Sequence, residues 1–466
     1  MKHTILIFFL SAFSITVFGQ PVETSFNLTF EKFLNSPELK HATVSLLLRD
    51  LKTGKIITDV NSQTGLAPAS TQKVVTATTA YSLLGKDFRY QTKIGYTGKI
   101  ENGKLTGDII IRGSGDPTLG SWRYGSAKED KVINDILNAV SQYGIHEITG
   151  HVLVDESEFS DEVIPDGWIW QDIGNYYGAG ARALNWRENQ FDLYLKSGSV
   201  VGTPVQIAGT RPEDIYRLRL RSFVTAGPAG SGDNGYIYLP MFEDTGNVRG
   251  TVPVNQDRFS ISGTMPHPAR QLAITIESRL KKKTFNEVAG NYPFSISPES
   301  SGINYFYSIN SPALDSICYW FLQKSINLYG EALLKTLGKH FGKNGSTSEG
   351  VKVVQDFWKK QGMDDYALNI IDGSGLSPQN RITTDDLVRV MSYAKQQSWF
   401  PSFYDDLPVF NGIKMKSGSI NGVLSYTGFI KNNSGDYVFA FIVNNYNGSG
   451  SAMRKKMWKV LDVLKP

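Results

Sequence analysis

Strand patterns at the two ends of the chain limit how it can fold. Residues 41–60 read as two short strands around a Lys-Thr-Gly-Lys turn. Three more strand patterns follow near the other end, over 409–416, 423–431 and 436–444. We expect these five strands to form one antiparallel sheet with helices covering it.

Helical periodicity fills much of the chain beside these strands. A helix is expected over 71–84, where small or apolar residues recur on one face. The stretch 311–341 also looks helical, as do 350–361 and 384–396. A last helix, over about 452–464, carries an apolar face that we expect to pack on the sheet, with a membrane-surface role as the alternative.

The middle of the chain, from 91 to 299, is rich in glycine and in short strand patterns, with helical exceptions near 128–143 and 268–281. Single cores stop growing at about 250–300 residues, so this length allows two or three domains. We predict an α/β (α+β) fold. Residues 20–90 and 300–466 would form one discontinuous domain, interrupted by a mostly β insertion over 91–299 that forms two subdomains.

The N-terminus predicts export. Residues 1–19 combine Lys2, an apolar run from Ile5 to Phe18 and a small residue before Gln20. This layout is typical of a secretory signal peptide, and the apolar run is too short for a stable membrane span. A buried N-terminal strand is the alternative. We expect cleavage near Gly19 and a soluble periplasmic or extracellular protein, with membrane association at most peripheral.

Composition gives no sign of a nucleic-acid partner. The chain is 41% hydrophobic and 20% charged, with a formal net charge of +4, as in an ordinary soluble globular protein. Its single cysteine, Cys318, cannot form an internal disulfide.

Ser70 and Lys73, in the segment APASTQK, are the strongest local signal for chemistry. Ser70 stands at the start of the expected helix, and Lys73 lies three positions on, so the two share a face. A helix N-terminus favours a developing oxyanion, and a desolvated amine can accept the serine proton. Ser-x-x-Lys occurs twice more in the chain, and Ser70 is equally compatible with a simple helix cap.

A Ser–Lys acyl-transfer site also needs a second hydroxyl, an amide and a cation for a substrate carboxylate. Short motifs of this kind occur elsewhere, and Lys52-Thr53-Gly54 is best read as a hairpin turn. Their order along the chain and their sequence context favour two of these motifs. The first, inside the helical stretch 311–341, contains Ser325 and Asn327. The second, in the terminal strands, contains Lys416, Ser417, Gly418 and Ser419.

In this order the three motifs resemble those of penicillin-binding proteins and serine β-lactamases. Four further segments are similar to the class-C low-molecular-mass group, the D-alanyl-D-alanine carboxypeptidase/endopeptidase family S13. The gap of 255 residues between Ser70 and Ser325 matches the large insertion of that family. The resemblance implies a DD-peptidase/β-lactamase-like fold. The four segments are KSINLYGEALLKTLG (324–338), DGSGLSPQNRIT (372–383), GSGDPTL (113–119) and YGAGARALNW (177–186).

The resemblance implies three catalytic residues. Ser70 would be the acylated nucleophile, Lys73 its general base, and Ser325 a relay of the proton towards the leaving D-alanine. Ile326 replaces the common acidic residue of the second motif, which leaves both ends of the motif intact.

It also implies a set of substrate-binding residues. Asn327 would hold a substrate amide and the base, while Lys416 and Ser417 would receive the terminal carboxylate. Ser417 replaces the usual threonine and keeps the hydroxyl. Gly418 completes the third motif, and the backbone N–H groups of Ser419 and of the nucleophile would form the oxyanion hole.

A loop related to the family's carries Asp372, Ser374 and Asn380, to which we assign a structural role.

We therefore expect a hydrolase that cleaves peptidoglycan stem peptides or cross-links, without cofactor or metal, and that β-lactams inhibit. A class A β-lactamase would need a glutamate after the second motif to activate water, and only Glu331 and Glu349 follow it. An α/β-hydrolase would need Gly-x-Ser-x-Gly, which does not occur. His146 and His151 lack the spacing of a metal-binding helix. A non-catalytic cell-wall-binding protein remains the alternative from another class.

Overall fold

The computed structural model describes residues 22–240, 243–293 and 302–465. The expected signal peptide over 1–19 lies outside these residues. Within them, every helix falls short of the length and apolar character that crossing a bilayer requires.

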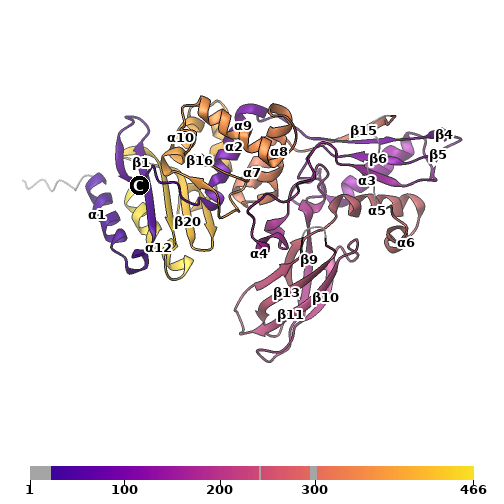
Figure 1. Ribbon diagram of the computed structural model, residues 1–466, viewed down its shortest axis with the longest axis horizontal. Helices are drawn as coiled ribbons and strands as arrows, with labels where there is room; N and C mark the ends of the chain where they lie inside the picture. Colours follow the sequence, from indigo (N-terminus) through magenta and orange to yellow (C-terminus); the bar gives the residue numbers. More distant parts are fainter. Residues whose placement is uncertain (1–21, 241–242, 294–301, 466) are drawn as a thin grey trace, which may run out of the picture.

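A six-stranded antiparallel sheet is built from both ends of the chain (Figure 1). β1 pairs with β21 along its whole length, from Thr43 opposite Asn444 to Asp50 opposite Tyr437. In sheet order the strands are β18 (Val409–Phe410), β19 (Ile413–Ile420), β20 (Val423–Asn432), β21 (Gly435–Asn444), β1 (Thr43–Asp50) and β2 (Ile56–Val60).

The predicted α/β (α+β) class and antiparallel sheet are confirmed, but the sheet has one strand more than predicted. The expected strand over 409–416 is divided into β18 and β19 by a turn at Asn411 and Gly412, which both have positive φ. The chain therefore folds back on itself and adds a two-residue strand at the edge.

One face of the sheet is covered by the two terminal helices, α1 (Val22–Leu34) and α12 (Gly450–Leu461). Phe439 and Phe441 of β21 point to this face, and Met453 and Met457 of α12 pack there at 1% exposure or less. The last helix thus packs on its own sheet, as expected. The helix α1 was not predicted from the sequence.

Alternate residues of β21, Val438, Ala440 and Ile442, face the opposite side of the sheet, because side chains in a strand alternate. They belong to the largest apolar core, which packs against a group of helices. These are α2 (Lys73–Leu84), α7 (Leu314–Gln323), α8 (Asn327–Phe341), α9 (Thr347–Lys360), α10 (Thr384–Lys395) and α11 (Phe400–Asp406).

The stretch 311–341, predicted as one helix, is two helices. The chain leaves α7 after Gln323 and enters α8 at Asn327, and Ser325 between them has φ 56°. A non-glycine residue rarely adopts this left-handed conformation and cannot continue a right-handed helix there. The second motif therefore lies in a break between two helices.

The middle of the chain forms two lobes with separate apolar cores. The first lobe has a four-stranded sheet in the order β15-β3-β6-β8 and a second, small sheet of three strands. It also contains three helices. Its elements are β3 (Gln91–Tyr96), β4 (Lys99–Glu101), β5 (Lys104–Thr106), β6 (Ile109–Arg112), β7 (Glu147–Ile148), β8 (Val152–Asp155), β15 (Asn304–Asn310), α3 (Glu129–Gln142), α5 (Pro268–Lys281) and α6 (Phe285–Gly290).

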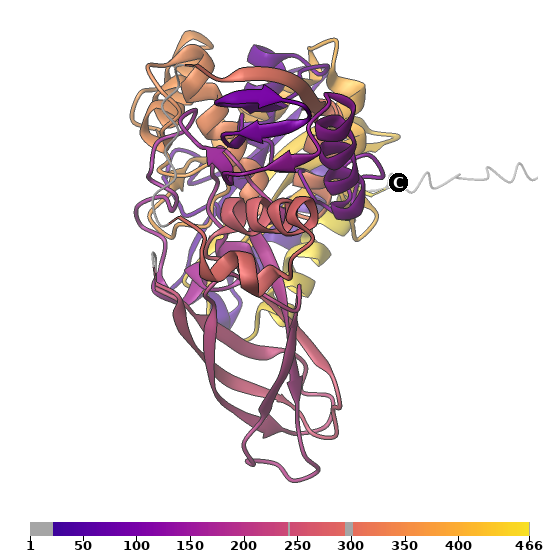
Figure 2. The ribbon, with the colours of Figure 1, turned by 90° about the vertical axis from the view of Figure 1, so that its right-hand side faces the viewer.

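The second lobe packs two three-stranded sheets against each other and extends away from the rest of the molecule (Figures 1 and 2). Its strands are β9 (Gln190–Lys196), β10 (Gln206–Arg211), β11 (Arg219–Gly227), β12 (Asn234–Tyr238), β13 (Thr245–Pro253) and β14 (Phe259–Thr264). Further short elements are α4 (Trp170–Ile173), and β16 (Leu368–Asn369) and β17 (Arg381–Ile382), which pair with each other.

The predicted domain boundaries, 20–90 with 300–466 around an insertion over 91–299, stay a prediction. β15 lies after residue 300 but pairs with β3 in the sheet of the first lobe. This pairing favours a boundary nearer residue 310.

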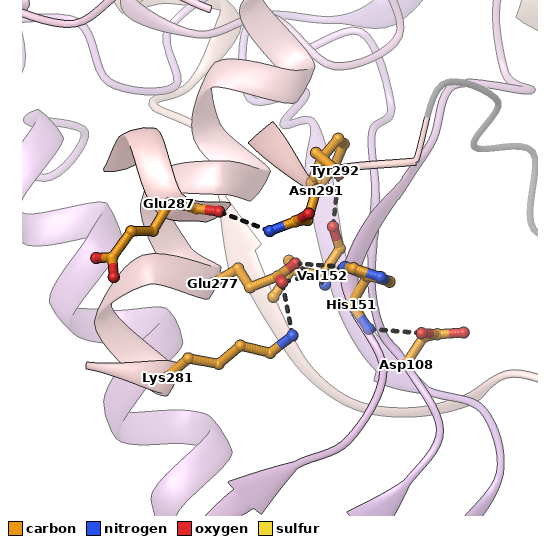
Figure 3. A network of polar contacts seen from close by, with 8 residues as sticks. All are labelled: Asp108, His151, Val152, Glu277, Lys281, Glu287, Asn291 and Tyr292. Atoms are coloured by element: carbon orange, nitrogen blue, oxygen red, sulfur yellow. Dashed lines mark hydrogen bonds and ion pairs between the residues drawn. The ribbon is translucent and has the colours of Figure 1, made fainter. Parts of the chain in front are cut away.

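His151 lies in a polar network that fixes α5 and α6 of the first lobe to β8 (Figure 3). The buried carboxylate of Glu277 accepts hydrogen bonds from Val152 N at 2.9 Å and Lys281 Nζ at 2.7 Å, and lies 3.1 Å from His151 Nδ1. Tyr292 Oη donates to Val152 O at 2.6 Å. Within the described part of the chain, no group of three or more potential metal ligands is found.

Candidate active site

Ser70 is held at a strained corner before α2. It lies in a 3-10 turn, Ala69–Gln72, and Ala69 has φ 47° although it is not glycine. Such conformations cost of order 1–3 kcal/mol and persist where surrounding contacts impose them. Here Ser425 Oγ of β20 donates to Pro68 O at 2.5 Å, and Thr71 Oγ1 donates to the same oxygen at 2.7 Å. The corner leaves Ser70 only partly buried while its neighbours are buried.

Lys73 is fully buried, and its Nζ has three oxygen neighbours. It lies 2.6 Å from Asn327 Oδ1, 2.7 Å from Ser374 O and 2.9 Å from Ser70 Oγ. The first two oxygens can only accept, because Asn327 Nδ2 donates to Tyr177 O at 2.8 Å and thereby fixes the amide. A neutral amine has two hydrogens for these acceptors, and its lone pair is then left for the hydroxyl of Ser70.

Burial is what makes a neutral amine available. It lowers the pKa of Lys73 from its usual 10.5 to about 7, while the carboxylates of Asp372 and Glu331 oppose this shift. Close to neutral pH, a substantial fraction of Lys73 is therefore unprotonated and able to take a proton from Ser70.

A second Ser–Lys pair lies across the site. Lys416 Nζ of β19 donates to Ser325 Oγ at 3.0 Å and to Ser417 O at 2.8 Å. Lys416 is 1% exposed, and burial lowers its pKa well below the usual value, helped by the nearby charge of Lys73. The break between α7 and α8 thus presents the Ser325 hydroxyl to the cation of the third motif.

β19 lies directly against the corner that carries Ser70. A Cβ on Gly418 would lie 2.5 Å from Pro68 O and 2.8 Å from Ser70 N, closer than real side-chain atoms come. Ser419, the next residue, is exposed and lines the hollow in front of Ser70. The backbone of the third motif therefore lies directly against the backbone of the candidate nucleophile, Ser70.

The loop that contains Asp372 packs against Gln72 and Lys73 and so supports the site. The carboxylate of Asp372 is fully buried and accepts hydrogen bonds from five N–H donors. The donors are Gln72 Nε2 (3.0 Å), Asn380 Nδ2 (2.9 Å), Trp168 Nε1 (2.9 Å), Gly375 N (2.8 Å) and Ser377 N (2.7 Å). This loop places Ser374 O on Lys73, which agrees with the structural role assigned to it.

Glu331 is one turn beyond Asn327 on α8 and is 1% exposed. Its Oε2 accepts from Gly373 N at 2.9 Å, and Oε1 has no hydrogen-bond partner among the described residues. Burial and the charge of Asp372 raise the pKa of Glu331 to about 8. From the sequence, Glu331 was considered only as a water-activating residue. Its place near Lys73 was missed, although its four-residue spacing from Asn327 could have indicated it.

A hollow of about 490 Å³ opens in front of Ser70. Ser325, Asn327 and Ser419 line it, together with residues from the insertion that the sequence analysis did not identify. These include Arg123, Asp172, Tyr177 and Glu188.

We expect acylation of Ser70 to depend on pH through Lys73. Below a pKa of about 7 the protonated amine has no lone pair, so the rate should fall about tenfold per pH unit and level off above it. The measurement is the second-order rate of penicillin acylation from pH 5.5 to 9. A rate that does not fall towards acid pH, or that is still rising tenfold per unit at pH 9, would contradict the assignment of Lys73 as the base.

Glu331→Gln refines this test. Because burial and the charge of Asp372 raise its pKa to about 8, Glu331 is mostly protonated across the acid limb, so the neutral glutamine should leave the position of that limb unchanged. A limb that moves to lower pH in the variant would show that Glu331 acts on Lys73 as a negative charge.

Comparison with known proteins covers nearly the whole chain. A family model described as the D-Ala-D-Ala carboxypeptidase 3 (S13) family matches residues 27–464. D-alanyl-D-alanine carboxypeptidase DacB of Haemophilus influenzae is 25% identical, over 94% of this chain and 94% of its own length. A D-alanyl-D-alanine carboxypeptidase of Actinomadura sp. (strain R39) is also 25% identical, over 90% of this chain and 80% of its own.

The fold is that of a solved penicillin-binding protein. The crystal structure of penicillin binding protein 4 from Haemophilus influenzae matches with a TM-score of 0.76 at 21% identity, over 95% of this chain and 99% of that one. The same protein in complex with a β-lactam matches with a TM-score of 0.70 at 19% identity, over 96% and 100%.

Proposed function

The chain belongs to the D-Ala-D-Ala carboxypeptidase 3 (S13) family and is a serine-type D-alanyl-D-alanine peptidase, and we propose that Ser70 is its nucleophile and Lys73 its general base. The observation that carries this proposal is the environment of Lys73 Nζ. Two acceptor oxygens take the amine hydrogens, and the remaining direction leads to Ser70 Oγ at 2.9 Å.

The reaction proceeds in two steps. Ser70 Oγ attacks the carbonyl carbon before the terminal D-alanine, and its proton passes to Lys73 Nζ. The backbone N–H groups of Ser70 and Ser419 stabilise the oxyanion. Collapse breaks the C–N bond, and the leaving amine takes a proton delivered through Ser325. Water then hydrolyses the ester on Ser70 and regenerates the enzyme.

The second Ser–Lys pair supports separate roles for Ser325 and Lys416. Ser325 Oγ accepts from Lys416 Nζ at 3.0 Å, so its own hydrogen is free to be directed to the leaving group. Lys416 and Ser417 receive the terminal carboxylate of the substrate. Asn327 holds Lys73 and a substrate amide.

Covalent labelling tests the proposal directly. Fluorescent penicillin should acylate the folded chain, and peptide mass analysis should locate the adduct on Ser70. An adduct on another serine would reject the assignment. No adduct on folded protein would favour a non-catalytic cell-wall-binding protein, and rapid turnover without accumulation would favour a β-lactamase.

Slow turnover of the penicillin adduct is the expected result. Of the two glutamates after the second motif, Glu331 is buried beneath Lys73, and Glu349 Oε2 accepts from Lys343 N at 3.0 Å near the start of α9. Neither lines the hollow in front of Ser70 in the described part of the chain. The glutamate-activated water of a class A β-lactamase therefore has no counterpart from these residues.

Lys416→Ala should weaken peptide hydrolysis chiefly by removing the partner of the terminal carboxylate. A buried charge-assisted contact is worth about 1.5–3 kcal/mol, or roughly 10- to 100-fold in kcat/KM. Hydrolysis of free-acid and amidated peptides by the wild type and by the variant measures this. The wild type should prefer the free acid and the variant should not. Equal rates on both peptides in the wild type would remove the basis for this role.

The N-terminal sequence supports a place of action outside the cytoplasm. We propose that residues 1–19 direct export and are removed near Gly19, so that the mature enzyme meets peptidoglycan there. N-terminal sequencing of the mature chain tests this, and an intact Met1 would contradict it.

A further inference from the structure

A second hollow, of about 720 Å³, adjoins the candidate active site. Gln190 lines both hollows. Trp122 and Arg187 line the second one, while the residues that follow them, Arg123 and Glu188, line the first. The second hollow therefore lies next to the first, with a shared wall of residues between them, and its lining comes from both inserted lobes.

The charges around this hollow balance. Three basic and three acidic residues line it: Lys128, Arg187 and Arg211, and Glu129, Asp130 and Asp192. Arg187 and Glu129 also form an ion pair with each other. A polyanion or a polycation would meet as much repulsion as attraction here, so the lining favours a ligand with uncharged polar groups.

Two side chains offer contacts that the protein itself uses only in part. Trp122 is 48% exposed, although the guanidinium of Arg123 lies over one face of its ring, 5.3 Å from the centroid. Arg187 is 6% exposed, and within the described residues its Nε has no hydrogen-bond partner. An open indole can cover the C–H face of a sugar ring, and an unsatisfied buried donor gains from a hydroxyl or acetamido oxygen.

We propose that the second hollow binds the glycan to which the stem peptide is attached, as an N-acetylated saccharide. This inference rests on the proposed function, because it takes the ligand of the first hollow to be a peptidoglycan peptide. A stem of five residues spans at most about 18 Å, so the sugar at its other end stays close to a site that holds its terminal D-alanine. Trp122 supports one sugar ring, and Arg187 and Gln190 contact its polar groups.

A pair of substrates tests the proposal: a disaccharide-pentapeptide and the same pentapeptide without the disaccharide. The wild type should show a kcat/KM about tenfold higher for the glycosylated substrate. Trp122→Ala should abolish this preference, and Trp122→Phe should keep most of it. Trp170→Ala is the matched control, because Trp170 is 55% exposed and is not among the residues that line either hollow.

Penicillin acylation separates failure of this inference from failure of the proposed function. All variants should be acylated on Ser70 at the wild-type rate, since penicillin carries no glycan, and normal acylation also shows that Trp122→Ala has folded. An acylated wild type without preference for the glycosylated substrate would overturn the glycan site alone. A preference that survives Trp122→Ala would also overturn it. An unacylated wild type would overturn the proposed function.

Direct binding gives a second readout. A tetramer of N-acetylglucosamine should bind the wild type in calorimetry, and Trp122→Ala should weaken it about tenfold. Salt-sensitive binding of the free pentapeptide to the second hollow, lost in Asp192→Asn or Arg211→Ala but not in Trp122→Ala, would replace the glycan with a peptide and overturn the proposal.

Discussion

Lys73→Ala should reduce penicillin acylation by about 10²–10⁴-fold and leave the protein folded. A positioned general base contributes about 10²–10⁴-fold, and in this site Lys73 is the amine in contact with Ser70 Oγ. Lys416 does not replace it, because its Nζ contacts Ser325 Oγ and Ser417 O. The acylation rate constant measures the effect, and thermal unfolding checks the fold.

A second buried lysine provides the matched control. Lys335 on α8 is 1% exposed, and burial lowers its pKa to about 8, but its Nζ donates to Glu162 O and Ala181 O. Lys335→Ala should therefore cost stability and leave acylation per folded molecule unchanged. Equal losses of acylation in both variants would mean that loss of a buried lysine, rather than loss of the base, explains the result. Unchanged acylation of Lys73→Ala would reject Lys73 as the base.

The sequence was sufficient to predict the elements whose signals are local. The hairpin over 41–60, the helix that follows Ser70 and the strands over 423–444 occur where predicted. Ser70 and Lys73 share a face because three residues separate them along a helical turn. The order of the other motifs then indicated Ser325 and Lys416. No local sequence signal showed that these two residues lie near Ser70 and Lys73 in the fold.

Features that depend on tertiary contacts were missed. Ser325 lies in a stretch with continuous helical periodicity, and no glycine marks its left-handed conformation. Asp372 gathers donors from Gln72 in the turn before α2, from its own loop and from Trp168 in the middle of the chain, a convergence that no spacing encodes. Arg123 and Glu188 reach the hollow from the insertion. Such contacts become visible only when the lobes and the sheet are placed together.

Gly418→Ala should reduce kcat by about 10²–10³-fold, the loss typical of a disrupted oxyanion hole. A Cβ at this position would lie 2.5 Å from Pro68 O and 2.8 Å from Ser70 N, and both are backbone atoms that a rotamer change cannot move. The strand or the corner must therefore shift, and the N–H groups of Ser70 and Ser419 separate from the position of the oxyanion. Steady-state hydrolysis of a D-alanyl-D-alanine peptide measures the loss.

The matched control for this variant is Gly235→Ala on β12. An added Cβ there makes only ordinary contacts, with Ile261 Cδ1 at 3.4 Å, so kcat should stay at the wild-type value. The distinguishing readout is the split between kcat and KM. If Gly418 matters because β19 must approach the nucleophile, kcat should fall more than KM rises, because the oxyanion contacts form in the transition state. A change in KM alone would assign Gly418 to substrate binding and reject its role in bringing the two N–H groups together.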